Sequence, residues 1–304
     1  MNERAQLGRS DTIRRFARNR VAVAAMVLLA LVALCAVFGP LLLPVSHRGL
    51  TRNQFAPPSL VHPFGTDLNG RDVLYRVLEG ARVSLFVGIT GALISFCVGT
   101  AYGLVAGYAG GKTDAFMMRT VEILYSIPRL IIILIFINAF DTILKKWLAL
   151  HGFGALIGYS KILILVLSLG LIEWLTMARI VRGQVLSLKA QQFVLAARSL
   201  GQSHVRILTK HLLPNLVSVV VIYLTLTVPA VILDESFLSF LGLGIQAPQA
   251  SWGSLLSDGA QVINPLRSNW WLLVCPAAVM SSTLLALNFL GDALRDALDP
   301  RATR

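Results

Sequence analysis

Residues 106–113 end in Gly-Lys-Thr and are the most obvious candidate for chemistry in the chain. Glycine-rich loops of this kind bind phosphates through backbone N–H groups, and their lysine reaches the terminal phosphates of a nucleotide. The mechanism requires a strand before the loop, whereas here a long apolar segment precedes it and no parallel-sheet pattern occurs. Ala106 also stands where the strict motif has glycine. We therefore expect a tight turn at Gly110 and Gly111, and no nucleotide binding by this chain.

Histidines and cysteines are the next candidates, because both residue types bind metals. His204 and His211 lie seven residues apart in one polar loop, which places them on one helix face, but no third ligand lies near them. Cys35, Cys97 and Cys275 lie in apolar runs without metal-ligand spacing, and we expect them to be buried as small hydrophobic residues. A paired nucleophile and base is also missing. The sequence predicts no metal site, no cofactor-binding site and no catalytic residue.

The elements that would position any functional group are long apolar segments. Of the 304 residues, 56% are hydrophobic and 14% are charged, which is too apolar for an ordinary soluble domain. A bilayer core requires about 20 apolar residues per helix, and inside it every backbone polar group must be satisfied within the protein. The sequence therefore predicts an all-α membrane protein with six transmembrane helices. These are Val21–Leu43, Val83–Ala106, Val121–Ala139, Ile162–Ala178, Leu216–Leu233 and Leu272–Leu290.

The basic residues indicate which side of the membrane each loop occupies, because Lys and Arg are enriched in cytoplasmic loops. With the leader (1–20) in the cytoplasm, both termini are cytoplasmic, and 17 of the 27 basic residues lie inside against 9 outside. Much of the net charge of +12 then borders the inner leaflet, so we attribute it to the lipid bilayer and not to nucleic acid. The first apolar segment is too long for a cleaved signal peptide.

The chain reads as one membrane domain without a separate soluble domain. Its parts are a cytoplasmic N-terminal lead-in (1–20), the first transmembrane helix (21–43), a periplasmic loop (44–82), a five-helix core (83–290) and a cytoplasmic tail (291–304).

Local signals refine this organisation. The loop 44–82 is rich in proline. Asp67 and Asp72 flank a start signal for a short helix to about Gly80, which would lie on the membrane surface or on a partner. Regularly spaced glycines in the second span favour close packing of neighbouring helices. Pro128 in the third span and Pro229 in the fifth favour kinks.

The loop 179–215 has six basic residues and no acidic one. Its first half predicts a short helix whose apolar face consists of Phe193, Ala196, Ala197 and Leu200. Gly201 can adopt the left-handed conformation that ends a helix. A second short helix follows before Pro214, which suits the first turn of the fifth span. The two alanines leave the apolar face flat, so that it can dock closely into a cleft.

The spacing Ala-Ala-x3-Gly-x11-Leu-Pro in this loop resembles a family signature. It is the EAA motif of binding-protein-dependent ABC importer permeases, whose usual form is Glu-Ala-Ala-x3-Gly-x9-Ile-x-Leu-Pro. Leu195 replaces the glutamate and His211 replaces the isoleucine, so a salt link from the first position is lost while hydrophobic docking remains. The matching residues are Ala196, Ala197, Gly201, Leu213 and Pro214.

The resemblance covers nearly the whole chain. Residues 178–184 (Ala-Arg-Ile-Val-Arg-Gly-Gln) are most similar to the oligopeptide branch. Other segments resemble the C-type permease subunit of the oligopeptide/dipeptide/nickel family, namely 64–67, 70–72, 235–244, 252–253 and 291–300.

The resemblance implies a type I ABC importer permease fold with cytoplasmic coupling helices, in a bacterial inner membrane. A homologous B-type permease subunit would share the path for oligopeptides or dipeptides, and a periplasmic binding protein would deliver them. Two cytoplasmic ATP-binding subunits would bind ATP and Mg²⁺ and drive import, so this chain itself would be no enzyme. Coupling to the ATPases would depend on Phe193, Ala196, Ala197, Leu200, Gly201, Leu213 and Pro214.

Three carboxylates inside or beside the spans are candidates for contact with the substrate or the binding protein, because ionisable residues in membranes are usually functional. Glu173 either lines the path or pairs with a neighbouring arginine. Asp234 and Glu235 either meet a peptide's amino terminus or the binding protein, or they have a structural role at a helix end.

Two alternatives stay open. A member of the same family could import nickel or another small solute, since the motifs do not fix the substrate. A secondary transporter that works without an ATPase belongs to another class, and the inverted repeats typical of such proteins are not evident here.

Overall fold

The computed structural model describes residues 16, 18–43, 53–263 and 268–298. These residues fold almost entirely into helices, and among them only Thr66 and Asp72 form an isolated β-bridge. The all-α prediction is therefore confirmed. The elements in chain order are α2 (Arg20–Leu42), α3 (Val73–Ala109), α4 (Gly111–Ser126), α5 (Arg129–Leu150), η2 (Gly154–Tyr159), α6 (Ser160–Leu188), α7 (Gln192–Ser199), α8 (His204–Ile207), η3 (Leu208–Leu212), α9 (Leu213–Phe240), α10 (Trp252–Val262) and α11 (Trp271–Leu298).

Five helical segments of the described chain are long and apolar enough to cross a membrane. They are α2, α3, α6 with the preceding η2, α9 with the preceding α8 and η3, and α11, which confirms five of the predicted spans. The bent pair of α4 and α5 is the sixth candidate.

The predicted third span, Val121–Ala139, is wrong as a continuous helix. α4 ends at Ser126 and α5 begins at Arg129, and the two helices are bent by 86°. Pro128 explains the break, because proline has no N–H to donate and restricts the residue before it to an extended conformation. Ile127 has that conformation. Pro229, by contrast, lies inside α9 without ending it.

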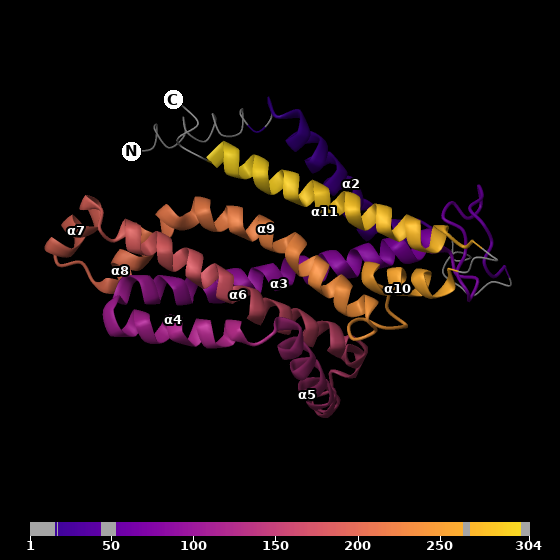
Figure 1. The fold of residues 1–304 in the computed structure, drawn as a ribbon, viewed down its shortest axis with the longest axis horizontal. Helices are drawn as coiled ribbons and strands as arrows, with labels where there is room; N and C mark the ends of the chain where they lie inside the picture. Colours follow the sequence, from indigo (N-terminus) through magenta and orange to yellow (C-terminus); the bar gives the residue numbers. More distant parts are fainter. Residues whose placement is uncertain (1–15, 17, 44–52, 264–267, 299–304) are drawn as a thin grey trace. The chain divides into compact units, whose positions relative to one another are not determined.

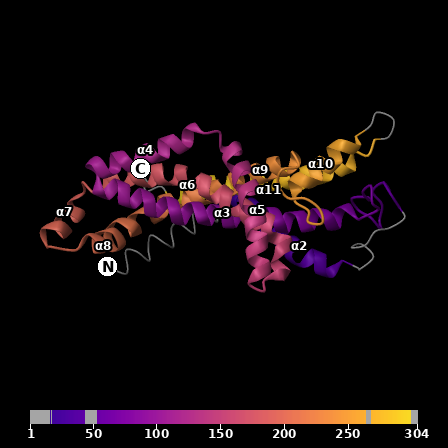
Figure 2. The same cartoon turned by 90° about the horizontal axis from the view of Figure 1, so that it is seen from below.

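The helices form two compact units. The first contains residues 1–88 and 232–304, and the second contains residues 89–231, so that α3 and α9 contribute to both. In the first unit α2 lies alongside α11, and α10 packs against the beginning of α11 (Figure 1). In the second unit α5 packs against α6, while α7 and α8 lie together at one end (Figures 1 and 2).

The start of α3 belongs to the core of the first unit. Val73 and Val77 are buried there against α10 and α11, in a cluster that also contains Leu255 and Trp271. The prediction of a short surface helix ending near Gly80 is therefore wrong in two respects. The helix continues without a break into the second span, and its apolar face packs on this chain itself.

Glycines bring α3 and α6 close together in the second unit. A Cβ atom at Gly103 would lie 2.5 Å from the carbonyl oxygen of Ala178, and one at Gly99 would lie 2.7 Å from that of Trp174. No side chain fits at such distances, so the two helices can pack only where α3 has glycine. The interpretation of these glycines as packing residues is confirmed.

The expected burial of the cysteines is wrong for two of them. Cys35 and Cys97 are exposed, and Cys275 is partly buried. Cys35 lies on α2 among exposed apolar side chains such as Leu31 and Leu34, as expected for a surface that lipid or another subunit covers.

Replacement of Gly103 by leucine should prevent α3 and α6 from packing. Overpacking of a tight site costs about 1–3 kcal/mol and occasionally more, so the purified protein should unfold at a clearly lower temperature than the wild type. Gly183→Leu on α6 is the matched control, because its Cβ would have no neighbour within 4 Å. Equal thermal stability of the two variants in detergent would contradict this packing.

Candidate functional site

The loop between α6 and α9 folds as expected at its most distinctive point. α7 ends at Ser199, and Gly201 just beyond the cap residue Leu200 is left-handed, with a φ of +72°. The N–H groups of Gly201 and Gln202 donate to the carbonyls of Arg198 and Ala197, at 2.9 and 3.1 Å. This pair of bonds satisfies carbonyls that the end of the helix would otherwise leave unpaired. The predicted helix end at Gly201 is confirmed.

The apolar face predicted for α7 divides into an inner and an outer part. Ala197, together with Val194, is buried and lies in a cluster with residues of α6, α8 and α9. Phe193 is 40% exposed and Leu200 is 80% exposed. Ala196 is exposed as well. Ala197 therefore anchors α7 in the core of the second unit. Phe193, Ala196 and Leu200 form the surface that is open to a partner.

Tyr108, near the end of α3, fastens this loop through two contacts. The hydroxyl group of Tyr108 shares a hydrogen bond of 2.8 Å with Nδ1 of His204, and the guanidinium group of Arg198 lies 4.9 Å from the centre of the Tyr108 ring. Sequence reasoning missed Tyr108, because an aromatic residue at the end of an apolar helix carries no sign of its distant partners.

The Gly-Lys-Thr sequence forms the first turn of α4, directly after a tight turn at Gly110 that follows α3. Gly110 and Gly111 have φ values of +67° and +55°, and α3 precedes them, so the predicted tight turn is confirmed. Asp114 just beyond the turn accepts two hydrogen bonds from Arg182 of α6, at 2.6 and 2.7 Å. Lys189 donates to the carbonyl of Gly107 at 2.7 Å. These contacts hold the end of α6, from which the α7 loop departs.

The segment after Gly201 differs from the predicted second helix. α8 passes through the short π-helical turn η3 directly into α9, and no separate helix forms. Pro214 lacks an N–H group, and Asn215 donates its side-chain amide to the carbonyl of His211 at 2.6 Å. Nε2 of His211 forms a hydrogen bond of 2.9 Å with Gln202. His211 thus holds Gln202, the residue that follows the turn at Gly201, against η3 at the start of α9. Leu213 and Pro214 are both exposed.

No group of three potential metal ligands occurs within the described part of the chain. His204 and His211 have separate partners, Tyr108 and Gln202. Their positions give no support to a metal site in the loop.

The exposed tip of the loop is apolar with basic surroundings. Leu195, Leu200 and Val205 are 49, 80 and 70% exposed. Exposed apolar groups gathered on one short segment commonly mark a protein contact. Leu195 occupies the position where the related motif has glutamate, so here the tip gains apolar surface at that place.

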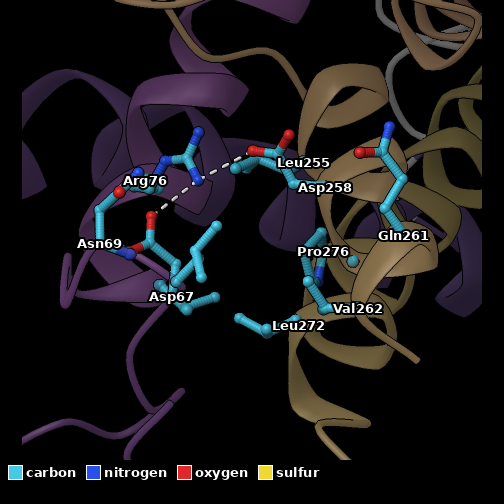
Figure 3. A pocket seen from close by; sticks show the side chains of 12 residues that line it. Asp67, Asn69, Arg76, Leu255, Asp258, Gln261, Val262, Leu272 and Pro276 are labelled. Carbon is cyan, nitrogen blue, oxygen red and sulfur yellow. Dashed lines mark hydrogen bonds and ion pairs between the residues drawn. The ribbon is translucent and has the colours of Figure 1, made fainter. Parts of the chain in front are cut away.

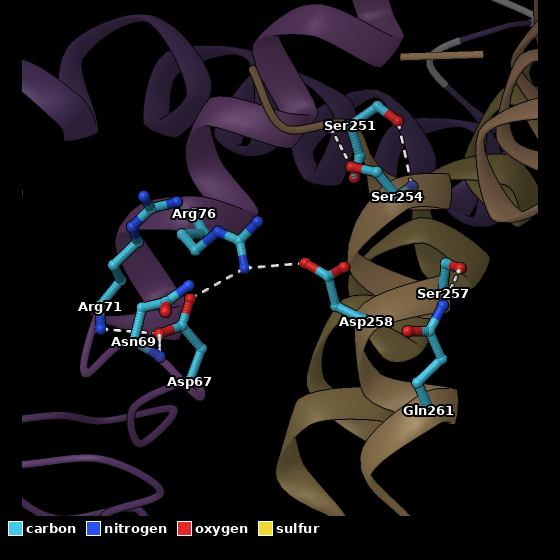
Figure 4. A network of polar contacts seen from close by, with 9 residues as sticks. All are labelled: Asp67, Asn69, Arg71, Arg76, Ser251, Ser254, Ser257, Asp258 and Gln261. Atoms are coloured by element: carbon cyan, nitrogen blue, oxygen red, sulfur yellow. Dashed lines mark hydrogen bonds and ion pairs between the residues drawn. The ribbon is translucent and has the colours of Figure 1, made fainter. Parts of the chain in front are cut away.

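A second candidate site lies in the first unit. Arg76 of α3 donates to Asp67 at 2.9 Å and to Asp258 of α10 at 3.0 Å (Figure 4). These three side chains form the polar wall of a cavity of about 140 Å³, whose other walls include Val73, Leu255, Val262 and Leu272 (Figure 3). Two carboxylates face one guanidinium group, so the cavity favours a cationic or hydrogen-donating group.

The segment before α3 is held in place by its two aspartates. Asp67 accepts hydrogen bonds from the backbone N–H groups of Asn69 and Arg71, both at 2.8 Å. Asp72 accepts one from the N–H of Tyr75 at 3.0 Å and so caps the first turn of α3. Sequence analysis anticipated this helix start but missed α10. The Ser251–Ser254 capping box was the local signal for α10.

The three candidate carboxylates have different surroundings. Glu235 is completely buried and accepts hydrogen bonds from Ser84, Ser239 and Ser236, at 2.9, 2.7 and 3.3 Å. This placement supports the structural alternative for Glu235. Asp234 is 7% exposed. Glu173 pairs with Arg129 at 3.3 Å. Pairing with a neighbouring arginine was one of the two roles considered for it, the other being a place along the path.

Family models match the chain over most of its length. Residues 99–304 match the binding-protein-dependent transport system inner membrane component, and residues 9–58 match the N-terminal TM domain of oligopeptide transport permease C. The chain belongs to this permease family. Its Ala196–Pro214 segment lies within the first match.

Curated relatives of this permease cover nearly all of it. It is 47% identical over 97% of its length to a dipeptide transport system permease protein of Bacillus subtilis, of which the alignment covers 86%. It is 44% identical over 96% of its length to oligopeptide transport system permease proteins of Haemophilus influenzae and Escherichia coli, of which 88% and 90% are covered. The resemblance inferred from the motifs is confirmed.

In this permease, removal of the Arg76 guanidinium should destabilise the fold, because the buried Asp67 carboxylate loses its charged partner. An uncompensated, largely buried charge destabilises a protein by about 3 kcal/mol, so Arg76→Met should unfold at a markedly lower temperature. Asp258 is 57% exposed, and an exposed ion pair contributes about 0–1 kcal/mol. Asp258→Asn should therefore have nearly wild-type stability. Equal losses in the two variants would contradict the described network.

Proposed function

We propose that this chain is the transmembrane permease subunit of an ATP-driven importer of oligopeptides or dipeptides. A homologous permease subunit would complete the path, and two cytoplasmic ATPase subunits would supply the energy. A periplasmic binding protein would deliver the substrate. The single observation that carries the proposal is the exposed apolar tip of α7, on a loop whose base is locked to the ends of α3 and α6.

The contacts of the loop suit the transmission of force. The cluster under α7 contains Val194 and Ala197 of α7, Val185 of α6 and Leu216 of α9. Protein interiors are close-packed and do not absorb strain as a liquid does. A partner that moves α7 would therefore move the adjoining parts of α6 and α9 with it.

The chemistry of the tip indicates the kind of partner surface. Phe193, Leu195 and Leu200 require an apolar cleft, and Arg198 and Arg206 nearby favour acidic groups at its rim. The distribution of basic residues along the sequence supports a cytoplasmic position of this loop, with both termini on the same side. An ATPase that hydrolyses ATP in the cytoplasm fits this position, and ATP and Mg²⁺ would then belong to that partner.

The names of the relatives support the substrate class. They are dipeptide and oligopeptide permeases, and they share 37–47% of their residues with this chain over nearly its whole length. We extend peptide transport to this chain on that basis. Competition between a radiolabelled tripeptide and nickel ions for uptake would separate the peptide from the metal alternative.

Replacement of Gly201 by valine should uncouple the ATPases from transport. A β-branched residue is strained at a φ of +72°, so the turn that presents Leu200 would have to change. We expect peptide uptake to fall at least about tenfold. A free-energy cost of roughly 1.4 kcal/mol for keeping the original turn already reduces the population of that turn tenfold. Uptake and ATP hydrolysis are measured together in vesicles that contain the complete transporter.

Gly201→Asn is the matched control, because asparagine tolerates the left-handed conformation and nothing lies within 4 Å of the added Cβ. It should retain most of the uptake. Normal peptide uptake and normal ATPase stimulation in Gly201→Val would refute the proposed role of the loop.

A further inference from the structure

Three contacts join the break between α4 and α5 to one face of α6. The hydroxyl groups of Tyr125 and Thr176 share a hydrogen bond. The guanidinium group of Arg179 lies 3.7 Å from the centre of the Tyr125 ring. Arg129 donates to Glu173 at 3.3 Å. Glu173, Thr176 and Arg179 follow one another at intervals of three residues, so they lie on the same side of α6.

This face lies at membrane depth. Glu173 is 13 residues from the first and 15 from the last residue of α6, which corresponds to about 20 Å from each end. A hydrocarbon core is about 30 Å thick. If the core is centred on α6, Glu173 and Thr176 lie near its centre. Arg179 is then about 7.5 Å from the centre and still inside the core.

Lipid cannot cover such a face. The Arg129 side chain is 54% exposed, Tyr125 is 43% exposed, and Thr176 and Arg179 are exposed as well. Charged side chains and irregular backbone occur at membrane depth only where they meet protein or water. The break at residues 126–128 is irregular backbone of this kind.

The opposite side of α6 shows the contrast. Leu167 and Leu171 are exposed there, and both are apolar as contact with lipid requires. Outside its contact with α3, α6 therefore exposes apolar residues on one side and polar residues on the other. The polar side must border an aqueous path or a second chain that shares that path.

The charge on the polar side is positive, because it holds two guanidinium groups and one carboxylate. Glu173 contacts Arg129. Among the described residues no carboxylate pairs with Arg179, whose recorded contact is the Tyr125 ring. Stacking on the ring leaves the N–H groups at the edge of the guanidinium plane available, and these bind carboxylates or phosphates through two parallel hydrogen bonds.

We propose that Arg179, held in place by Tyr125, binds the carboxylate at the C-terminus of the peptide during transport. This site rests on the proposed function, and it names the part of the substrate that the path recognises. The terminal carboxylate is the one anionic group that every unmodified peptide carries. A partly solvated arginine binds a carboxylate weakly, so the peptide can leave again.

The test uses the complete transporter with its homologous permease, ATPases and binding protein in proteoliposomes. Uptake of a tripeptide with a free C-terminus and of its C-terminal amide is measured for the wild type and for Arg179→Gln. We expect kcat/KM to fall about 5- to 30-fold for the free acid and to change less than about twofold for the amide. The binding protein is the same in both cases, so its own preference cancels in each ratio of variant to wild type.

Arg119→Gln is the matched control. Arg119 is an exposed arginine on α4 that pairs with Glu122 and takes no part in the three contacts that join the break to α6. Its replacement should leave the uptake of both peptides unchanged. An effect of this control equal to that of Arg179→Gln would overturn the proposal.

Equal losses for the free acid and the amide, or no loss for either, overturn the site. A lipid phosphate has the same chemistry as a ligand. A loss for both peptides that occurs only in vesicles with anionic lipid would assign Arg179 to a lipid headgroup and would also overturn it.

If the wild type carries no measurable amide, Arg179→Lys decides the matter on the free acid. A lysine variant that keeps clearly more uptake than the glutamine variant, though less than the wild type, supports recognition of the carboxylate, because lysine keeps the charge but not the planar fork of donors. Equal losses in both variants overturn it. If the wild-type transporter carries neither peptide, the proposed function fails and not merely this site.

Discussion

The coupling proposed for this chain depends on the apolar cluster that joins α7 to α6 and α9. Val194 and Ala197 point inward from α7 and meet Val181 and Val185 of α6 and Leu216 of α9. Without this cluster, eight residues of helix in a polar loop would be marginal in water. With it, the exposed Leu200 is the outer end of a packed structure. A short loop that is supported in this way can offer a firm surface for contact with another protein.

The membrane as a solvent explains the other features of the second unit. Helices in lipid gain little from apolar burial and associate through close packing, which the glycines of α3 provide opposite Ala178 and Trp174. Polar groups and broken backbone must then face something other than lipid. The break at Pro128 and the polar side of α6 occur together for this reason, and they mark the surface at which transport is expected.

The sequence predicted what depends on local rules. Five apolar spans, the turn at Gly110 and Gly111 and the helix end at Gly201 followed from composition and from the conformational freedom of glycine. The sequence did not predict which residues of the α7 face are buried and which are exposed. Four apolar positions at helical spacing do not reveal that Ala197 is the one that faces inward.

Contacts between distant residues were not predictable either. Arg76 and Asp258 are far apart in the chain, and nothing local marks them as partners. The same is true of Tyr108 and His204, and of Arg182 and Asp114. The kink expected at Pro128 proved to be a complete break, since Ile127 before it leaves the helical conformation as well. Pro229 shows that proline alone does not decide this outcome.

The central claim is that a cytoplasmic ATPase grips the tip of α7. It is tested most directly by a cysteine at Leu200, which is 80% exposed, in a chain whose three native cysteines are replaced by alanine. We predict a cross-link from this cysteine to a co-purifying ATPase subunit, and no labelling by a membrane-impermeant thiol reagent added outside intact cells. Labelling from outside, without any cross-link to an ATPase, would contradict it.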